Sequence, residues 1–139
     1  MASVFTLIIE GKIPGNFIWK DEKSVAILTI QPIRQGHVLV IPRQEIDQWS
    51  DLPLDLAEHL MQVSHKIANA LKVAYPASRI GLMIAGLEVP HTHIHLVPMD
   101  SMDDLSFAFA KNADSNQLKE TAEKIRSVLQ QQGHNESKV

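Results

Sequence analysis

The sequence predicts an α+β fold built on one antiparallel sheet. Three observations support this: short apolar runs bounded by turn residues, two long segments with helical periodicity, and the order in which they alternate. The expected order is three strands, a helix, two strands and a second helix, so consecutive strands can pair directly. With 139 residues, the chain has the length of a single domain with one core.

The first part of the chain predicts a short helix followed by three strands. Apolar residues from Phe5 to Ile9 recur at helical spacing until Gly11 and Pro14 interrupt them, so a short first helix or a turn is expected. A charged turn at 21–23 joins the first two strands. The expected strands lie within 16–22, 24–32 and 34–42.

The segment 51–76 carries the strongest helical periodicity. Asp51 is the predicted N-cap, with Pro53 in the first turn, and Pro76 marks the end. A second amphipathic helix is expected over 114–132, capped by Asp114 or Ser115. The apolar residues of the helix expected within 51–76 recur at steps of three and four: Leu56, Leu60, Val63, Ile67 and Leu71.

Two strands are expected between these helices, within 78–99, with a break near 85–87. Residues 100–104 read as a loop, and 105–110 as a short edge strand or an irregular segment. The expected domain spans 1–132, and the polar residues 133–139 are predicted to be a disordered tail.

Composition limits the classes of function. The formal net charge is -3 and the sequence pI about 6.1, which gives no electrostatic reason to expect nucleic-acid or membrane binding, although a local site can still bind a small anion. The chain has no cysteine, which excludes disulfides and thiolate zinc sites. No apolar stretch approaches about 20 residues, and the N-terminus lacks a leader signature, so we expect a soluble, cytoplasmic protein.

Three histidines occupy alternate positions: His91, His93 and His95. On a strand they would share one face, with neighbouring Cα atoms roughly 6–7 Å apart, while Ile94 and Leu96 face the core. The chain has only seven histidines, so three within five residues argue for a function.

The residues alone leave three interpretations of this pattern. It can be an exposed polar face. It can be a metal site in which two of the histidines bind with His37 or Glu88 as a third ligand. It can also be a nucleophilic site, because a neutral imidazole can attack phosphorus while neighbouring groups fix its tautomer and donate to phosphate oxygens.

The segment 91–97, HTHIHLV, closely resembles the motif His-φ-His-φ-His-φ-φ of the histidine-triad (HIT) nucleotide-binding proteins, with Thr92 as a mild departure. Segments 8–14, 35–43 and 86–98 resemble further family segments in the same order. The resemblance implies a five-stranded antiparallel sheet with two main helices and a homodimer. It also implies transfer or hydrolysis of a nucleoside monophosphate group through a nucleotidyl-histidine intermediate, with no metal or other cofactor.

The resemblance also implies roles for residues. His93 would attack the α-phosphorus, His91 and His37 would fix its tautomer, and His95 would bind a phosphate oxygen or assist the leaving group. Glu88 would line the phosphate side. Five residues match positions that wall the nucleoside pocket in relatives, although core packing explains them equally well: Val4, Phe5, Ile8, Ile27 and Ile30.

Several positions depart from the family pattern. Thr29 stands where relatives usually have an aspartate that accepts both ribose hydroxyls, and a neutral acceptor binds more weakly than a charged one. Ser3 and Thr6 stand where zinc-binding relatives carry cysteines. Leu87 replaces a common glutamine, and the turn before the triad is short. These changes bear on the substrate more than on the nucleophile.

The expected function is therefore hydrolysis of a nucleoside 5'-phosphoramidate, or a related purine nucleotide ester or anhydride, by a homodimer. The alternatives are a dinucleoside polyphosphate hydrolase, a non-catalytic nucleotide-binding protein, and a metal-dependent enzyme that uses two of the triad histidines. Phe107 or Phe109 is a candidate for shaping the leaving-group site. Other polar residues are expected to be solvent-exposed: His59, His65, Asp100, Asp103 and Asp104.

Overall fold

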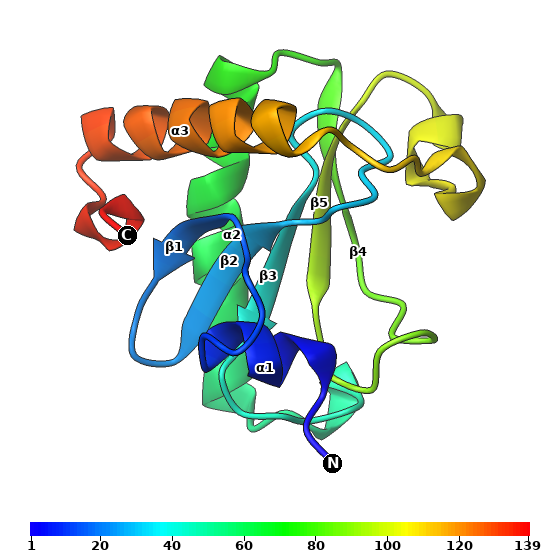
Figure 1. The fold of residues 1–139 in the computed structure, drawn as a ribbon, viewed down its shortest axis with the longest axis vertical. Coiled ribbons are helices and arrows are strands. Elements are labelled where there is room, and N and C mark those ends of the chain that lie inside the picture. The colour runs from blue at the N-terminus through cyan, green and yellow to red at the C-terminus, as the bar shows by residue number, and fades with distance from the viewer.

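The computed structural model describes residues 1–139 and confirms the predicted α+β class. A single five-stranded antiparallel sheet has the strand order β1-β2-β3-β5-β4 (Figure 1). Its strands are β1 Phe17–Lys20, β2 Ser24–Leu28, β3 Val38–Pro42, β4 Arg79–Met83 and β5 Ile94–Met99. The helices are α1 Val4–Ile9, α2 Leu54–Ala74 and α3 Ser115–Gln131, with 3-10 turns η1 Trp49–Asp51, η2 Met102–Leu105, η3 Phe107–Phe109 and η4 Asn135–Ser137.

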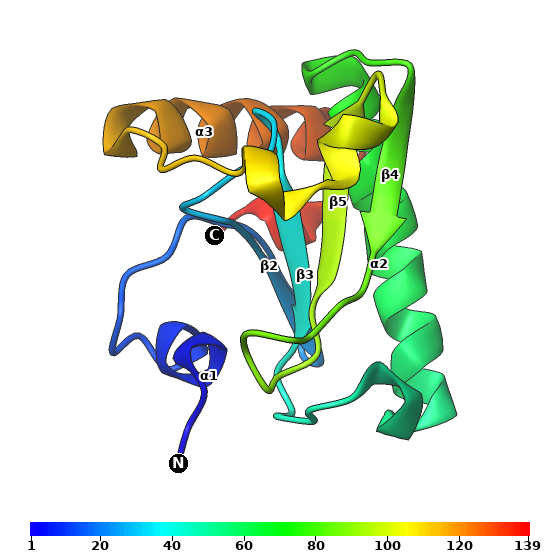
Figure 2. The same cartoon turned by 90° about the vertical axis from the view of Figure 1, so that its right-hand side faces the viewer.

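The two faces of the sheet have different cover. Figure 2 shows α2 on one side of the strands and α1 on the other. Alternate residues of each strand face opposite sides, so Ala26 and Leu28 join the main core with α2 and α3, while Val25 and Ile27 join a smaller cluster with Phe5 of α1. The thin cover on the α1 side leaves room there for a cavity.

The register of β5 places its histidine on the thinly covered side. Ile94 and Leu96 are buried in the main core, as predicted. His95 is paired with Leu39 of β3, which belongs to the smaller cluster on the α1 side. The alternation of the strand therefore aims the His95 side chain toward α1.

Two predicted boundaries are wrong. Helix α2 begins at Leu54 with Pro53 as its N-cap, whereas Asp51 ends η1. A residue before proline is disfavoured in the helical region, so Leu52 is extended and separates the two elements. Strand β5 begins only at Ile94, because the main chain at Thr92 donates to Ile46 O instead of joining the sheet.

The C-terminal residues differ from the prediction as well. Residues 105–110 are the irregular alternative and not a strand, since Leu105 ends η2 and 107–109 form η3. The tail is not disordered: η4 forms there, Ser137 is fully buried, and the His134 ring lies 5.6 Å from that of Trp19. The short helix α1 and the cap Asp114 are confirmed. None of the helices has the length and apolarity needed to cross a membrane.

Gly36 gives a test of the turn that leads into β3. Its φ is +92°, and an added Cβ would lie 3.1 Å from Tyr75 Cδ2 and 3.2 Å from Pro98 Cγ. Gly133 has the same φ of +92° but no neighbour within 4 Å. A left-handed conformation costs an alanine about 1–2 kcal/mol at either site, and crowding adds about 1–3 kcal/mol only at Gly36. Urea unfolding should therefore show a clearly larger loss for Gly36→Ala than for Gly133→Ala, and equal losses would contradict this account.

Candidate active site

A cavity of about 450 Å³, here called the triad pocket, lies on the α1 side of the sheet. Its volume is in the range of small-molecule sites, about 300–1,000 Å³. Helix α1, strand β2 and the loops that follow β2 and β4 contribute to its wall. It gathers every predicted site residue except His91: Val4, Phe5, Ile8, Ile27, Thr29, Ile30, His37, Glu88, His93 and His95.

The side chain of His93 has its tautomer set by the main chain. His93 Nδ1 lies 2.7 Å from the carbonyl oxygen of His91. A carbonyl only accepts, so Nδ1 carries the proton and donates it. Burial is the main influence on this ring and lowers its pKa. In the neutral ring, Nε2 therefore holds a free lone pair.

The side chain of His95 has the opposite tautomer, which two hydrogen bonds in series impose. The Ile33 amide donates to His37 Nδ1 at 3.0 Å, so His37 must donate from Nε2. That atom lies 2.9 Å from His95 Nδ1, which therefore accepts and leaves the proton of His95 on Nε2. His37 thus contacts His95, not His93, which corrects the predicted role of His37.

Burial keeps both members of this pair neutral. It is the main cause that lowers the pKa of His37 to about 4, and the nearby His93 adds to the effect. Burial likewise lowers the pKa of His95 to about 3, with further contributions from His93 and His37. Two aromatic rings pack edge-on against these imidazoles: the ring centroids of Phe5 and His93 lie 4.8 Å apart, and those of Phe107 and His95 lie 4.9 Å apart.

His91 lies behind the pocket and is fully buried. Its Nε2 donates to Pro42 O at 2.8 Å, and its Nδ1 lies 2.6 Å from Ser3 Oγ, which donates to it. Burial again lowers the pKa of this ring.

Glu45 accepts hydrogen bonds from Ser3, the partner of His91, and from Thr6 of helix α1. Its Oε1 accepts from Ser3 N at 2.7 Å and from Thr6 Oγ1 at 2.6 Å. Sequence reasoning missed Glu45 because a single carboxylate some forty residues away carries no pattern.

The Ser3, Thr6, Glu45 and His91 cluster does not fit the structural zinc expected in cysteine-bearing relatives. Neutral hydroxyls stand at the two cysteine positions, and they are not among the usual zinc ligands. Hydrogen bonds satisfy their polar atoms directly: Ser3 Oγ donates to His91 Nδ1, and Thr6 Oγ1 donates to Glu45 Oε1. No group of three His, Asp or Glu residues in the chain has the arrangement of a metal site.

Other predicted residues have mixed outcomes. Thr29 lines the pocket, and its hydroxyl already accepts from the amide of Gln31 at 3.2 Å. His65 is exposed as predicted, but His59 is not, because its Nε2 lies 3.0 Å from Asp21 Oδ2 and its side chain is 26% exposed. Asn16 is a polar wall residue that no motif pointed to.

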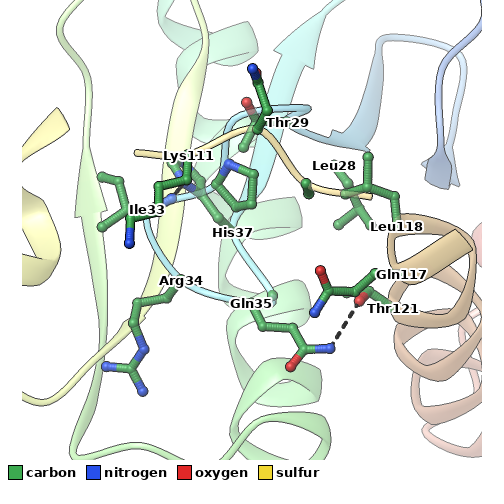
Figure 3. Close-up of a pocket in the computed structure, with 14 residues that line it drawn as sticks. Leu28, Thr29, Ile33, Arg34, Gln35, His37, Lys111, Gln117, Leu118 and Thr121 are labelled. Carbon is green, nitrogen blue, oxygen red and sulfur yellow. Dashed lines mark hydrogen bonds between the residues drawn. The ribbon is translucent and has the colours of Figure 1, made fainter. Parts of the chain in front are cut away.

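A second pocket of about 250 Å³ lies next to the first and shares Leu28, Thr29 and His37 with it. Figure 3 shows its wall, with Gln35 bonded to Thr121. That bond measures 3.3 Å. Arg34 and Lys111 line this second pocket and not the triad pocket.

Comparison with known proteins identifies the family of the chain. The family model described as "HIT domain" matches residues 10–102. The chain belongs to the HIT family. It is 32% identical over 121 residues to an uncharacterized HIT-like protein of Methanocaldococcus jannaschii, covering 83% of this chain and 94% of that protein. It is 34% identical over 98 residues to the adenosine 5'-monophosphoramidase HNT1 of Saccharomyces cerevisiae, covering 70% and 62% of the two chains.

Solved HIT structures share the fold. A zinc-bound histidine triad family protein from Mycobacterium smegmatis superimposes with a TM-score of 0.81 at 30% identity, over 95% of this chain and 96% of the other. A hypothetical histidine triad nucleotide-binding protein from Sulfolobus tokodaii gives a TM-score of 0.81 at 28% identity, over 91% of each chain. The HIT assignment and the five-stranded antiparallel sheet predicted from the triad motif are therefore confirmed.

The neutral histidine pair predicts acid sensitivity. The ordinary pKa of 6.5 falls to about 4 for His37 and about 3 for His95 in the folded chain. Between pH 6.5 and these lower values, the unfolded chain binds protons that the folded chain does not. The stability that the two neutral rings contribute is therefore fully present above pH 6.5, and it is lost as the pH decreases toward 4 and 3. Urea unfolding of His37→Asn at several pH values should show a smaller decrease in the free energy of unfolding toward acid pH than the native chain shows. The control His65→Gln, which replaces an exposed histidine, should show the same decrease as the native chain. A native-like decrease in His37→Asn would contradict the conclusion that His37 is held neutral.

The hydroxyl of Ser3 should matter for stability, because it satisfies the buried Nδ1 of His91. Ser3→Ala leaves His91 Nδ1 with only the long 3.5 Å contact to Thr6 Oγ1 and also removes the N-cap of α1, and each loss costs about 1–2 kcal/mol. Ser3→Thr keeps a hydroxyl for both. We expect chemical denaturation to show this loss for the alanine variant only. A loss of similar size in both variants would mean that shape, not the hydrogen bond, is what Ser3 supplies.

Proposed function

We propose that this HIT protein hydrolyses a nucleoside 5'-phosphoramidate, with His93 as the nucleophile. One observation carries the proposal: two neighbouring imidazoles in one pocket hold opposite tautomers. His93 Nδ1 donates to a carbonyl, and His95 Nδ1 accepts from His37. Their remaining nitrogens therefore supply a lone pair and an N–H donor, with the ring centroids 4.8 Å apart.

Attack on a phosphorus atom uses both groups, the lone pair of His93 and the N–H of His95. In the first step His93 Nε2 forms a bond to the α-phosphorus while the phosphorus–nitrogen bond breaks, and the amine leaves with a proton from solvent. The N–H of His95 donates to a phosphoryl oxygen, where negative charge gathers. In the second step water attacks the phosphorus, the bond to His93 breaks, and one proton returns to solvent. The sum is one water consumed for each phosphoramidate.

The His91 carbonyl supports the first step directly. As His93 Nε2 bonds to phosphorus, the ring becomes positively charged, and a hydrogen bond from Nδ1–H to a carbonyl strengthens when its donor is charged. The bond that fixes the tautomer therefore also stabilises the covalent intermediate.

The nucleoside half fits the apolar part of the pocket. Phe5, Ile8 and Ile27 offer a hydrophobic wall for a base, and we propose that it is a purine. The hydroxyl of Thr29 accepts from Gln31 and so has limited capacity for a ribose hydroxyl. The sequence similarity to a yeast adenosine 5'-monophosphoramidase supports the choice of a phosphoramidate.

The test is turnover of adenosine 5'-phosphoramidate by the pure protein in excess EDTA. His93→Ala should lower kcat/KM by at least about a thousandfold, as the loss of a nucleophile does, with an unchanged circular dichroism spectrum. His65→Ala removes an exposed histidine from α2 and should leave turnover unchanged. Native-like activity in the His93 variant would rule out its role as the nucleophile, and loss of native activity that zinc restores would favour a metal-dependent reaction.

A further inference from the structure

We propose that Arg34 is a positioning residue of the triad pocket: it holds the segment 105–110, here called the strap, so that the Phe107 ring stays against His95. The inference rests on the proposed function, in which the Nε2–H of His95 donates to a phosphoryl oxygen. It deepens that function by naming a residue that acts on His95 from outside the triad pocket.

The strap forms part of the wall of the triad pocket. Phe107 and Ala110 line the pocket, and Phe107 packs edge-on against His95, with the ring centroids 4.9 Å apart and the planes at 66°. The ring of His95 also packs against His93, with the centroids 4.8 Å apart. Phe107 therefore contacts the proposed hydrogen-bond donor directly, whereas Phe109 does not line the pocket.

The contact with Phe107 supplies what the hydrogen bond of His95 does not. His37 fixes the Nδ1 atom of His95 at 2.9 Å, but a single hydrogen bond leaves the imidazole free to tilt about it. Rings packed against the imidazole restrict that tilt and so fix the direction of the Nε2–H bond. Because a misplacement of about 1 Å can lower a rate about a hundredfold, the position of the Phe107 ring bears on turnover.

The strap has few ties of its own to the rest of the chain. Its amides donate to acceptors in η2 or in the strap itself, so no hydrogen bond joins it to the sheet. The rings of Phe107 and Phe109 are 44% and 51% exposed. Local hydrogen bonds and half-exposed rings do little to fix a segment, so the flanks of the strap must hold it.

Both flanks of the strap are attached to the loop between β2 and β3. On the N-terminal side, Arg34 Nη1 donates to Asp104 Oδ2 at 2.7 Å, and Arg34 Nη2 donates to Asp100 Oδ2 at 3.2 Å. On the C-terminal side, the Lys111 amide donates to Pro32 O at 3.2 Å. The second attachment is made by the main chain, whereas the first depends on the Arg34 side chain. Replacing Arg34 therefore releases one flank and leaves the other attached.

Asp104 joins Arg34 to the start of the strap. Its Oδ2 atom also accepts from the amides of Asp100 at 2.8 Å and Ser101 at 3.3 Å. The hydrogen bond from the Asp100 amide is the main cause that holds the pKa of Asp104 below its ordinary value, so the carboxylate stays charged at neutral pH. Figure 3 shows Arg34 pointing away from His37, so any effect of the guanidinium on the triad passes through the strap.

The first measurement is turnover of adenosine 5'-phosphoramidate. Arg34→Gln and Phe107→Ala should each lower kcat about tenfold to a hundredfold, with a smaller change in KM, because the N–H of His95 acts mainly in the transition state. The matched controls are Phe109→Ala, on the same strap, and Arg79→Gln, at an exposed arginine outside both pockets. Both controls should keep the native kcat.

The second measurement tests whether Arg34 acts through Phe107. If it does, adding Arg34→Gln to Phe107→Ala should change kcat by less than about twofold, because the contact that Arg34 positions is already lost. Arg34→Lys keeps the charge and should recover part of the lost kcat. The free energy of unfolding of Arg34→Gln should stay near the native value, because a partly exposed ion pair contributes little to global stability.

The third measurement does not depend on turnover. The ring current of Phe107 shifts the NMR signals of the His95 ring protons, so these signals report the contact between the two rings. Arg34→Gln should move the His95 signals toward their positions in Phe107→Ala, and Arg79→Gln should leave them unchanged.

Native His95 signals in Arg34→Gln, or losses of kcat that multiply in the double variant, would overturn the role of Arg34. A loss in Phe109→Ala as large as that in Phe107→Ala would reject the specific contact with His95. Absence of turnover in the native chain would instead contradict the proposed function, and the His95 signals would then decide alone whether Arg34 holds the strap.

Discussion

The hydrogen bond from His93 Nδ1 to the carbonyl of His91 is the interaction on which the site depends. At 2.7 Å it fixes which ring nitrogen is free, and the reaction proposed above needs that nitrogen for attack. The position of that carbonyl depends in turn on the buried His91 side chain, which Pro42 O and Ser3 Oγ hold from two sides. Ser3 also caps α1, so the helix that walls the pocket and the main chain that orients His93 share one support.

The fold explains why these groups meet on one side. The sheet has a thick core under α2 and α3 and only a thin cluster under α1. The two-residue period of β5 sends Ile94 and Leu96 into the thick core, which leaves His95 on the thin side beside Leu39. A shift of one residue in this register would bury the histidine among apolar side chains and expose the two aliphatic ones, so packing energy specifies the site.

The sequence was informative where a pattern repeats and silent where contacts are distant. Alternation and helical spacing predicted all five strands and both long helices, and the triad motif led to ten pocket residues. The late start of β5 and the ordered tail depend on single contacts, Thr92 with Ile46 and His134 with Trp19, which leave no periodic trace. The start of α2 is different, because the proline that places it is local in the sequence and its effect on Leu52 could have been foreseen. The partnership of His37 with His95, and the role of Glu45, depend on how distant loops are folded together.

Burial links the chemistry of the triad pocket to its charge. Removing water from the imidazoles keeps them neutral, which a nucleophile and an oxygen donor with fixed tautomers both require. In the proposed reaction the positive charge that forms on His93 therefore meets the carbonyl of His91, to which Nδ1–H donates, and no neighbouring imidazolium repels it.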